Sequence, residues 1–121
     1  MMLRKMLPLV LLITAVAGDC LSAEGAAPGL PGGTVAGKDP VLLAPGFINT
    51  GVTTRDVTMT PDGRHLYFCM ASAGYSKAVI LVTEFVDGAW TEPAVAPFSG
   101  SPDWIDLEPF ISPDGQRFFF M

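Results

Sequence analysis

The sequence predicts an all-β fold assembled from repeated antiparallel sheets. Residues 56–69 overlay residues 108–121 without a gap, at an offset of 52 residues. The chain is also rich in turn-forming residues, with 13 Gly and 11 Pro among 121 residues, and its apolar runs are short. This combination favours many short strands over helices. A repeat at such a period is typical of a propeller or a solenoid.

A four-residue turn lies at the centre of each copy. The first turn is formed by Thr60, Pro61, Asp62 and Gly63, and the second by Ser112, Pro113, Asp114 and Gly115. Proline fixes φ near −65° at the first corner of a type I turn, Asp tolerates the second corner, and Gly takes the left-handed position after it. The residue before the proline is pushed into the extended region. Each copy should therefore be a strand, a turn and a strand. The alternative is two unrelated hairpins with a common turn, and the matching flanks argue against it.

The first repeat unit contains four candidate strands. We expect them at residues 56–60, 64–70, 78–85 and 89–94. A loop of small and polar residues at 71–77 separates the second strand from the third, and Asp87-Gly88 predicts a hairpin turn after the third. Pro93 fits the fourth strand only at a sheet edge. Residues 95–106 should cross back to a second unit, which begins with strands at 107–112 and 116–121.

The second and third strands are apolar at nearly every position. Strict alternation is expected when one face of a sheet meets water, and continuous apolar runs indicate that both faces are covered. Stacked blades cover both faces in this way. A two-layer sandwich is the alternative, but it should show more alternation.

The repeat resembles a known family. Each copy has an acidic residue, then Ser/Thr-Pro-Asp-Gly, then an aromatic run. This pattern is similar to the repeat of the TolB-type, WD-repeat-like β-propeller family, which has many exported and uncharacterised members. The segment Asp87-Gly88-Ala89-Trp90 and the run at 96–100 share the resemblance, which covers residues 44–121. It implies a partial propeller at 41–121, with one blade at 55–94 and the start of the next at 107–121. It also implies that residues 41–43 supply an outer strand to the last blade.

The resemblance also bears on the length of the chain. A propeller needs at least four blades, so about 200 residues or more at this period. We therefore expect the chain to be the N-terminal part of a longer protein, whose remaining blades are its first partners. The alternative is a short chain that closes by self-association.

The N-terminus predicts export. Arg4 and Lys5 precede an apolar run at 7–17, which is too short to span a bilayer but right for a signal peptide at 1–17. A buried N-terminal helix or strand is the alternative. Residues 18–40, rich in Gly, Ala and Pro, predict a flexible linker. The mature protein would be periplasmic or extracellular and would have no transmembrane segment.

The two cysteines have different surroundings. Cys20 follows the leader, but Asp19 departs from the small residue that usually precedes a lipid-modified cysteine, so lipid anchoring is the less favoured interpretation. A disulfide between Cys20 and Cys69 is compatible with an oxidising compartment. However, Cys69 lies within a strand and matches Met121 in the second copy. This equivalence predicts a buried thiol used as a small hydrophobic group.

The charge balance narrows the class of partner. The net charge is −5, and it becomes −7 when Arg4 and Lys5 leave with the leader. An acidic surface argues against nucleic acid and against anionic membranes. It is compatible with a cationic ligand, a metal ion or simple solubility.

Four carboxylates form the best candidate site. They are Asp56, Asp103, Asp106 and Glu108, where Asp56 is the repeat equivalent of Glu108. Asp106 and Glu108 are two residues apart, so on a strand they would share a face at the mouth of the central channel. Such a group could bind Ca²⁺ or attract a cation. The favoured alternative is that Asp56 and Glu108 accept backbone N–H bonds or pair with Arg55 and Arg117. Because the spacing lacks the ligand density and glycine of a calcium loop, we expect no metal and no cofactor.

Two tryptophans and one histidine complete the candidates. Trp104, in a polar loop beside Asp103, is the better ligand-binding candidate, because an exposed ring can stack on a sugar or a peptide side chain. Trp90 follows Asp87-Gly88 and should pack over the blade edge. His65 follows a turn and matches Arg117, which indicates a solvated strand end, and we expect no catalytic residue.

These observations favour a non-catalytic binding module of the bacterial cell envelope. Its ligand would be a protein, a peptide or a glycan, bound at the channel mouth or the loops. The main alternative is the propeller portion of an exported hydrolase whose catalytic residues lie outside this chain. A third interpretation is a scaffold with a peptidoglycan-binding partner, as the TolB resemblance implies.

Overall fold

The structure is a computed structural model that describes residues 28–33 and 37–121. Within these ranges the fold is mostly β and contains no α-helix. The elements in chain order are η1 (Pro31–Gly33), β1 (Thr53–Met59), β2 (His65–Ala71), η2 (Ala73–Tyr75), β3 (Ala78–Val86), β4 (Ala89–Trp90), β5 (Ala94–Val95), β6 (Phe110–Ile111) and β7 (Phe118–Phe119). The predicted leader, Cys20 and part of the predicted linker lie outside the described residues.

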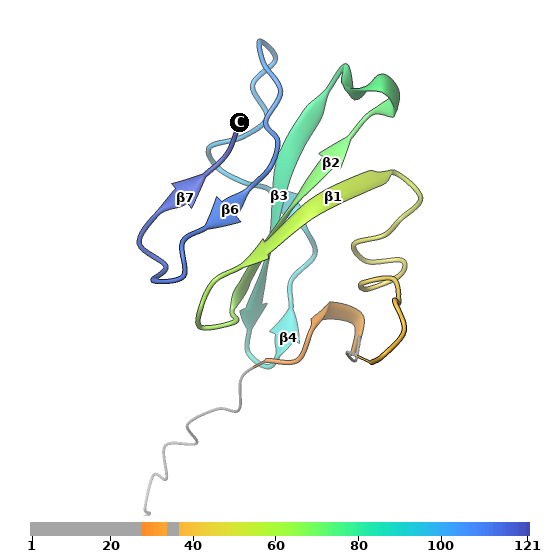
Figure 1. The fold of residues 1–121 in the computed structure, drawn as a ribbon, viewed down its shortest axis with the longest axis vertical. Helices are drawn as coiled ribbons and strands as arrows, with labels where there is room; N and C mark the ends of the chain where they lie inside the picture. The colour runs from red at the N-terminus through yellow and green to blue at the C-terminus, as the bar shows by residue number, and fades with distance from the viewer. Residues whose placement is uncertain (1–27, 34–36) are drawn as a thin grey trace, which may run out of the picture.

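The larger sheet is antiparallel and strongly curled (Figure 1). Its strand order is β1-β2-β3-β4, and β5 also pairs with β3. The pairing of β2 with β3 is regular from His65↔Glu84 to Ala71↔Ala78. The predicted strands at 64–70 and 78–85 are confirmed to within one residue at each end. The first strand begins three residues before its predicted start.

The fourth strand is not continuous, so the prediction of one strand over 89–94 is wrong. β4 pairs with β3 through Phe85↔Trp90 and β5 through Val82↔Ala94, and the register shifts by one residue between them. Pro93 has no N–H to give to the ladder and lies at the interruption. Thr91 bridges the gap, because its N–H donates to Glu84 O at 2.8 Å and its hydroxyl accepts from Glu84 N at 3.0 Å.

The hairpin turn at Asp87-Gly88 is confirmed. Asp87 has φ 51° and Gly88 has φ 85°. Two positive φ values in a two-residue loop are those of a type I′ turn, whose twist matches that of the flanking strands. The Asp-Gly pair therefore fixes the register between Val86 and Ala89.

The 52-residue repeat holds in three dimensions. β6 and β7 form a second, small antiparallel sheet, and Leu107 and Met121 extend it by exchanging two backbone hydrogen bonds. Each hairpin contains a one-residue irregularity in its first strand, where Asp56 has φ 57° and its equivalent Glu108 has φ 56°. Positive φ with an extra residue opposite the partner strand is the geometry of a β-bulge. The two copies thus share a bulge that the sequence pattern did not reveal.

The two Pro-Asp-Gly turns share the same hydrogen bonds. In the first, the Thr60 hydroxyl donates to Asp62 Oδ1 at 2.6 Å and accepts from His65 N at 3.0 Å, while Asp62 Oδ1 also accepts from Arg64 N. The second turn repeats these bonds at the equivalent positions. Ser or Thr and Asp are therefore required together, because each side chain satisfies backbone N–H groups that the tight turn leaves unpaired.

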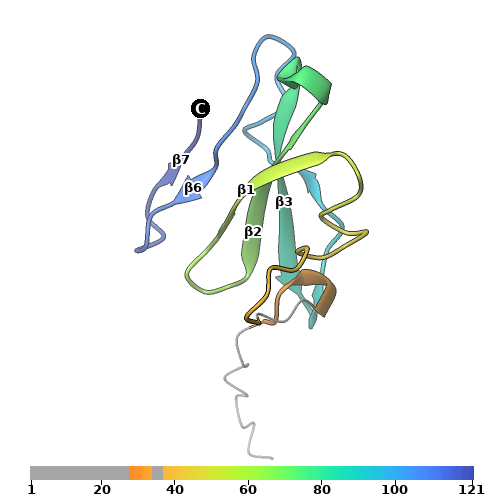
Figure 2. The same ribbon diagram turned by 45° about the vertical axis from the view of Figure 1, so that its right-hand side comes forward.

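Both faces of the larger sheet are covered, as the continuous apolar runs predicted. We call them the N-terminal face, which carries Leu66, Phe68 and Leu81, and the hairpin face, which carries Tyr67, Ile80 and Val82. The N-terminal face is covered by a segment that includes Ala44 and Ile48. The hairpin face is covered by the β6–β7 hairpin and the segment before it, with Ala96, Ile105, Leu107 and Phe118. Figures 1 and 2 both place the β6–β7 hairpin beside this sheet.

The covering segment on the other face, residues 28–33 and 37–50, is hereafter the N-terminal segment. Pro31 is buried, and Trp90 Nε1 donates to Gly29 O at 2.9 Å. Within the predicted linker, residues 28–31 therefore contact the folded part of the chain, whereas residues 37–40 are exposed. Val41 and Leu42 are exposed and belong to no strand in the described residues, whereas Leu43 packs on the core.

Candidate functional site

The predicted carboxylates are not gathered at one place. Asp106 is 2% exposed and accepts hydrogen bonds from Ser99 Oγ at 2.7 Å and Gly100 N at 3.2 Å. The Asp106 N–H donates to Ala78 O, and Ser99 Oγ accepts from Ile80 N. Asp106 therefore ties the crossing segment to β3. It does not share an exposed face with Glu108, because the bulge at Glu108 breaks the alternation on which that prediction depended.

Asp56 and Glu108 meet at one cation, as the favoured alternative expected. Arg55 Nε lies 2.5 Å from Asp56 Oδ2, and Arg55 Nη2 lies 3.5 Å from Glu108 Oε1. Asp56, and then Tyr75, raise the pKa of Arg55 above its usual range. The Arg55 guanidinium is thus a permanent charge that joins the first strands of the two copies.

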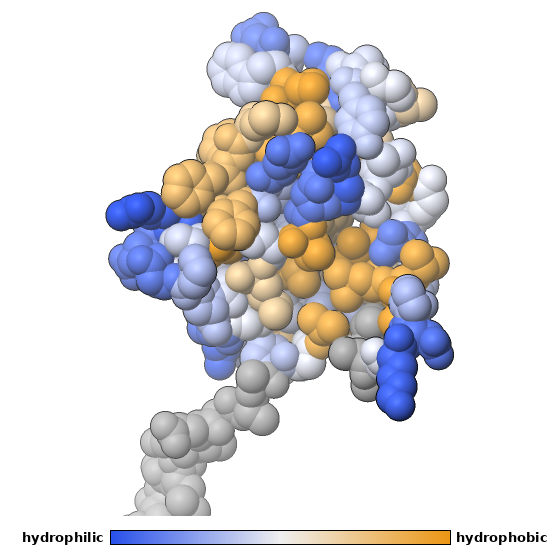
Figure 3. All heavy atoms as spheres, viewed as in Figure 1, coloured by the Kyte–Doolittle hydropathy of each residue, from blue (hydrophilic) through white to orange (hydrophobic). Residues whose placement is uncertain are grey.

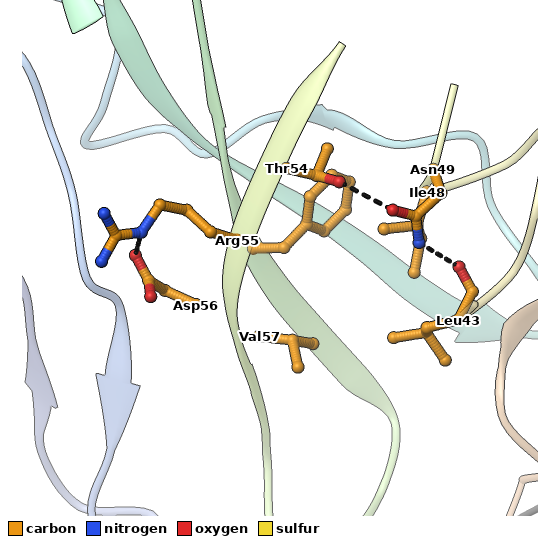
Figure 4. Close-up of a pocket in the computed structure, with 8 residues that line it drawn as sticks. Leu43, Ile48, Asn49, Thr54, Arg55, Asp56 and Val57 are labelled. Atoms are coloured by element: carbon orange, nitrogen blue, oxygen red, sulfur yellow. Dashed lines mark hydrogen bonds and ion pairs between the residues drawn. The ribbon is translucent and has the colours of Figure 1, made fainter. Parts of the chain in front are cut away.

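A small pocket adjoins β1, and Arg55 and Asp56 form part of its lining. Figure 4 shows Arg55 and Asp56 directed toward the β6–β7 hairpin, while Ile48 and Asn49 lie across β1 from them. The pocket has a volume of about 130 Å³. Asn49 closes one wall, because its Nδ2 donates to Leu43 O at 2.6 Å and its Oδ1 accepts from Thr54 Oγ1 at 3.0 Å. With its polar groups paired among themselves, this pocket offers a ligand little to bind.

No metal site is formed by the residues described. Within residues 28–33 and 37–121, no group of three or more His, Cys, Asp or Glu side chains is placed to hold a metal ion. Asp103 is exposed, Asp106 is buried and Glu108 faces Arg55. The calcium interpretation of this acidic group therefore has no geometric support.

The loops at one end of the sheet carry two of the exposed aromatic residues, Tyr75 and Trp104. Trp104 is 61% exposed beside Asp103, and Tyr75 is 40% exposed in η2. Lys77 joins the two loops, because its Nζ donates to Pro102 O at 2.8 Å. Arg55 lies 5.9 Å from the centre of the Tyr75 ring. This end, hereafter the loop end, thus combines two exposed rings with two cations held in place.

An apolar hollow lies next to these loops. Its volume is about 280 Å³, and its lining consists of Val52, Met70, Ala71, Ser72, Lys77, Ala78 and Val79. Ligand pockets for small molecules usually measure about 300–1,000 Å³. The hollow therefore suits one apolar side chain or one ring better than a whole cofactor.

The remaining candidates lie where the sequence indicated. Trp90 packs edge-on against Phe85 of β3, with ring centres 5.5 Å apart. His65 lies at the start of β2, with its Nε2 3.9 Å from Glu84 Oε1. Cys69 is fully buried and free, and burial raises the pKa of its thiol. The prediction of a buried thiol used as a small hydrophobic group is confirmed.

Sequence reasoning missed several residues that shape this region. Ser99 and Asn49 order loops through side-chain hydrogen bonds, and Tyr75 and Lys77 form the loop end. Tyr75 stands alone among small polar residues at 71–77, which was the available signal. No feature of the sequence singled out Ser99, because the fold of the segment between them brings Ser99 to its partner Asp106.

Comparison with known proteins adds nothing to this geometry. The chain matches no protein-family model, no curated protein and no solved structure. Within the residues described, no helix is long and apolar enough to cross a membrane.

Proposed function

We propose that this chain is part of an exported β-propeller that serves as a non-catalytic binding module of the bacterial envelope. The observation that carries the proposal is the arrangement of the two repeat copies. They have the same turns and the same bulge, and they lie with their first strands adjacent. Ile111 N donates to Thr58 Oγ1 at 3.2 Å, and Arg55 reaches Glu108. Adjacent inner strands with sheets stacked face to face are the plan of a propeller.

The binding role rests on the loop end. Tryptophan and tyrosine at an exposed position offer a large apolar area with a polar edge, which is the chemistry enriched at protein-binding sites. The hollow beside Lys77 takes one apolar side chain. A protein or peptide segment that presents an apolar residue next to a carboxylate therefore fits best. A glycan that stacks on the Trp104 ring is the alternative ligand for the same site.

A binding experiment with matched variants tests the proposal. The full chain is immobilised and exposed to a library of peptides and to a glycan array, with Trp104→Ala as the test variant. Loss of one aromatic contact should weaken binding roughly tenfold to a hundredfold, as for a typical interface aromatic residue. Phe98→Ala is a poor control because the Phe98 ring contacts the Phe118 ring, with centres 5.0 Å apart. Val41→Ala instead changes an exposed residue away from the loop end. Equal affinity of Trp104→Ala and Val41→Ala would remove the loop end as the site.

A further inference from the structure

Three Asp-Gly pairs occur in the chain, and the structure holds one of them differently from the other two. They lie at 62–63, 87–88 and 114–115. The first and third belong to the repeated turns, and the second forms the turn between β3 and β4. In an Asp-Gly pair the backbone nitrogen of the glycine can attack the side chain of the aspartate, because glycine has no side chain to hinder the approach. The three pairs therefore carry the same chemistry in different surroundings.

Both reacting groups are held in the repeated turns. Gly63 N donates to Thr60 O at 2.8 Å, so the nitrogen that would attack is already bonded. The Asp62 carboxylate accepts from the Thr60 hydroxyl at 2.6 Å and from Arg64 N at 3.0 Å. The second turn repeats these three bonds at the equivalent positions. An attack within either turn must first break them.

The charge state of the repeated turns acts in the same direction. Attack needs the neutral carboxylic acid, because a carboxylate carries no group that can leave. The hydroxyl of Thr60 or Ser112, and then a backbone N–H, lower the pKa of Asp62 and Asp114. Near neutral pH the reactive acid form is therefore scarcer in both turns than it is for an ordinary aspartate.

The turn between β3 and β4 leaves both reacting groups unbonded. Among the residues that the structure describes, the Asp87 carboxylate accepts no hydrogen bond and pairs with no cation, and the Gly88 N–H donates none. Both residues are exposed. Figure 3 shows apolar side chains gathered over the β6–β7 hairpin, and Figure 1 places this turn away from them. Because β4 pairs with β3 through only two residue pairs, this end of the hairpin opens readily.

We propose that Asp87-Gly88 is a site of spontaneous backbone modification, at which the chain converts slowly to an isoaspartate form. The Gly88 nitrogen bonds to Cγ of the protonated Asp87 side chain, and the amide proton and the side-chain hydroxyl leave as water. The product is a five-membered succinimide ring, and no atom is oxidised or reduced. Water then opens the ring at either carbonyl. Opening at Cγ restores aspartate, whereas opening at the main-chain carbonyl carbon leaves the chain running through Cγ as isoaspartate.

The modification would act on the contacts of β4. An isoaspartate adds one carbon to the backbone of the turn, whereas a type I′ turn fits two ordinary residues. The pairing Phe85↔Trp90 depends on that turn. Trp90 also packs on Phe85 and donates to Gly29 O at 2.9 Å. Modification at Asp87 should therefore loosen β4 and its contact with the N-terminal segment.

Peptide mapping of the aged full chain by mass spectrometry tests the inference. The folded chain and a sample unfolded in urea are incubated at mildly acidic pH, and isoaspartate is quantified at the three Asp-Gly pairs. Each hydrogen bond that must break before attack slows the reaction roughly twofold to tenfold. In the folded chain, isoaspartate should form at least about tenfold faster at Asp87 than at Asp62 or Asp114, and in urea the three rates should converge. Equal rates in the folded chain, or an Asp87 that reacts only in urea, overturn the inference.

Thr60→Val tests whether the hydrogen bonds of the repeated turn protect it. The variant removes the hydroxyl bond to Asp62 and leaves the equivalent bond from Ser112 to Asp114 in the same molecule. Modification at Asp62 should rise roughly twofold to tenfold, while Asp114 stays unchanged as the internal control. No rise at Asp62 would refute the protective role of the turn. A rise at both positions would indicate an unfolded variant, and the comparison within the unaltered chain then decides.

Asp87→Gly tests the consequence for β4. Glycine keeps the positive φ of the turn and has no side chain to be attacked. The Thr91 N–H donates to Glu84 O at 2.8 Å, so its hydrogen exchange reports the state of this strand pair. Ageing should speed that exchange in the unaltered chain and leave it unchanged in Asp87→Gly, and equal exchange in both aged chains would refute the loosening of β4. None of these measurements involves Trp104, so the modification and the binding role can fail independently.

Discussion

Replacing Asp106 is the sharpest test of how the crossing segment is held. The carboxylate is buried and accepts from Ser99 Oγ and Gly100 N. A hydrogen bond to a charged group contributes about 1.5–3 kcal/mol, and a buried donor without a partner costs about 1–3 kcal/mol. Asp106→Ala removes one acceptor that serves two donors. We expect it to reduce the free energy of unfolding by about 3 kcal/mol.

The effect of Asp106→Asn should be smaller. The amide oxygen can still accept from one donor, so about 1–2 kcal/mol should be lost. Asp103→Asn is the matched control three residues away, because Asp103 is exposed and its hydrogen bond to Ser101 Oγ is made by the backbone N–H and not by the carboxylate. Its effect should stay within about 0.5 kcal/mol.

Urea unfolding followed by circular dichroism measures these differences. The slope of the free energy against urea must stay constant for the comparison to hold. A double-mutant cycle with Ser99→Ala isolates the pair, and its interaction energy should lie in the range of about 0.5–3 kcal/mol. If Asp106→Ala and Asp103→Asn are equally stable, the buried carboxylate does not hold the crossing segment and the reasoning fails.

Three further predictions concern the turns and the core. Gly63→Ala should lower the free energy of unfolding by about 1–2 kcal/mol, because Gly63 has a left-handed φ of 72°. Gly115→Ala should lower it more, because the added Cβ would also lie 3.2 Å from Pro61 Cδ. Equal losses of the two variants in urea unfolding would contradict this. The turn hydroxyls lower the pKa of Asp62 and Asp114 from 3.8, so their stabilisation is present above that value and is lost as the pH falls through the lowered pKa. When both residues are replaced by Asn, the free energy of unfolding should therefore fall less steeply as the pH is lowered. An unchanged dependence of that free energy on acidic pH would refute this prediction. Cys69 should react with a thiol reagent only after denaturation, once the other cysteine is replaced by Ser, and rapid labelling of the folded chain would show that its burial is wrong.

Short-range chemistry made much of the fold predictable. The Pro-Asp-Gly turns, the type I′ turn at Asp87-Gly88 and the boundaries of β2 and β3 depend on residues within a few positions of each other. The apolar runs in β2 and β3 required cover on both faces, whatever supplied it. The position of Cys69 within an apolar strand was enough to predict a buried thiol, although its repeat equivalent Met121 is 67% exposed.

The candidate site was less predictable, because it depends on where the chain departs from regular pairing. The alternation rule placed Asp106 and Glu108 on one face, but the bulge at Glu108 separates them. Bulges are set by the partner strand, so the acidic residues at 56 and 108 gave no local sign of positive φ. Likewise, nothing near Asp106 in the sequence distinguishes it from the exposed Asp103.

The sequence by itself determined the repeat, its turns and the need for covered sheet faces, because these follow from local backbone chemistry and from the cost of exposing apolar strands. Only the tertiary structure decided which segment covers each face, which carboxylate is buried and which aromatic residues stay exposed. Those outcomes depend on contacts between residues far apart in the chain, such as Pro28 with Gly63 and Ser99 with Asp106. Such contacts are fixed by packing and leave no pattern in neighbouring residues.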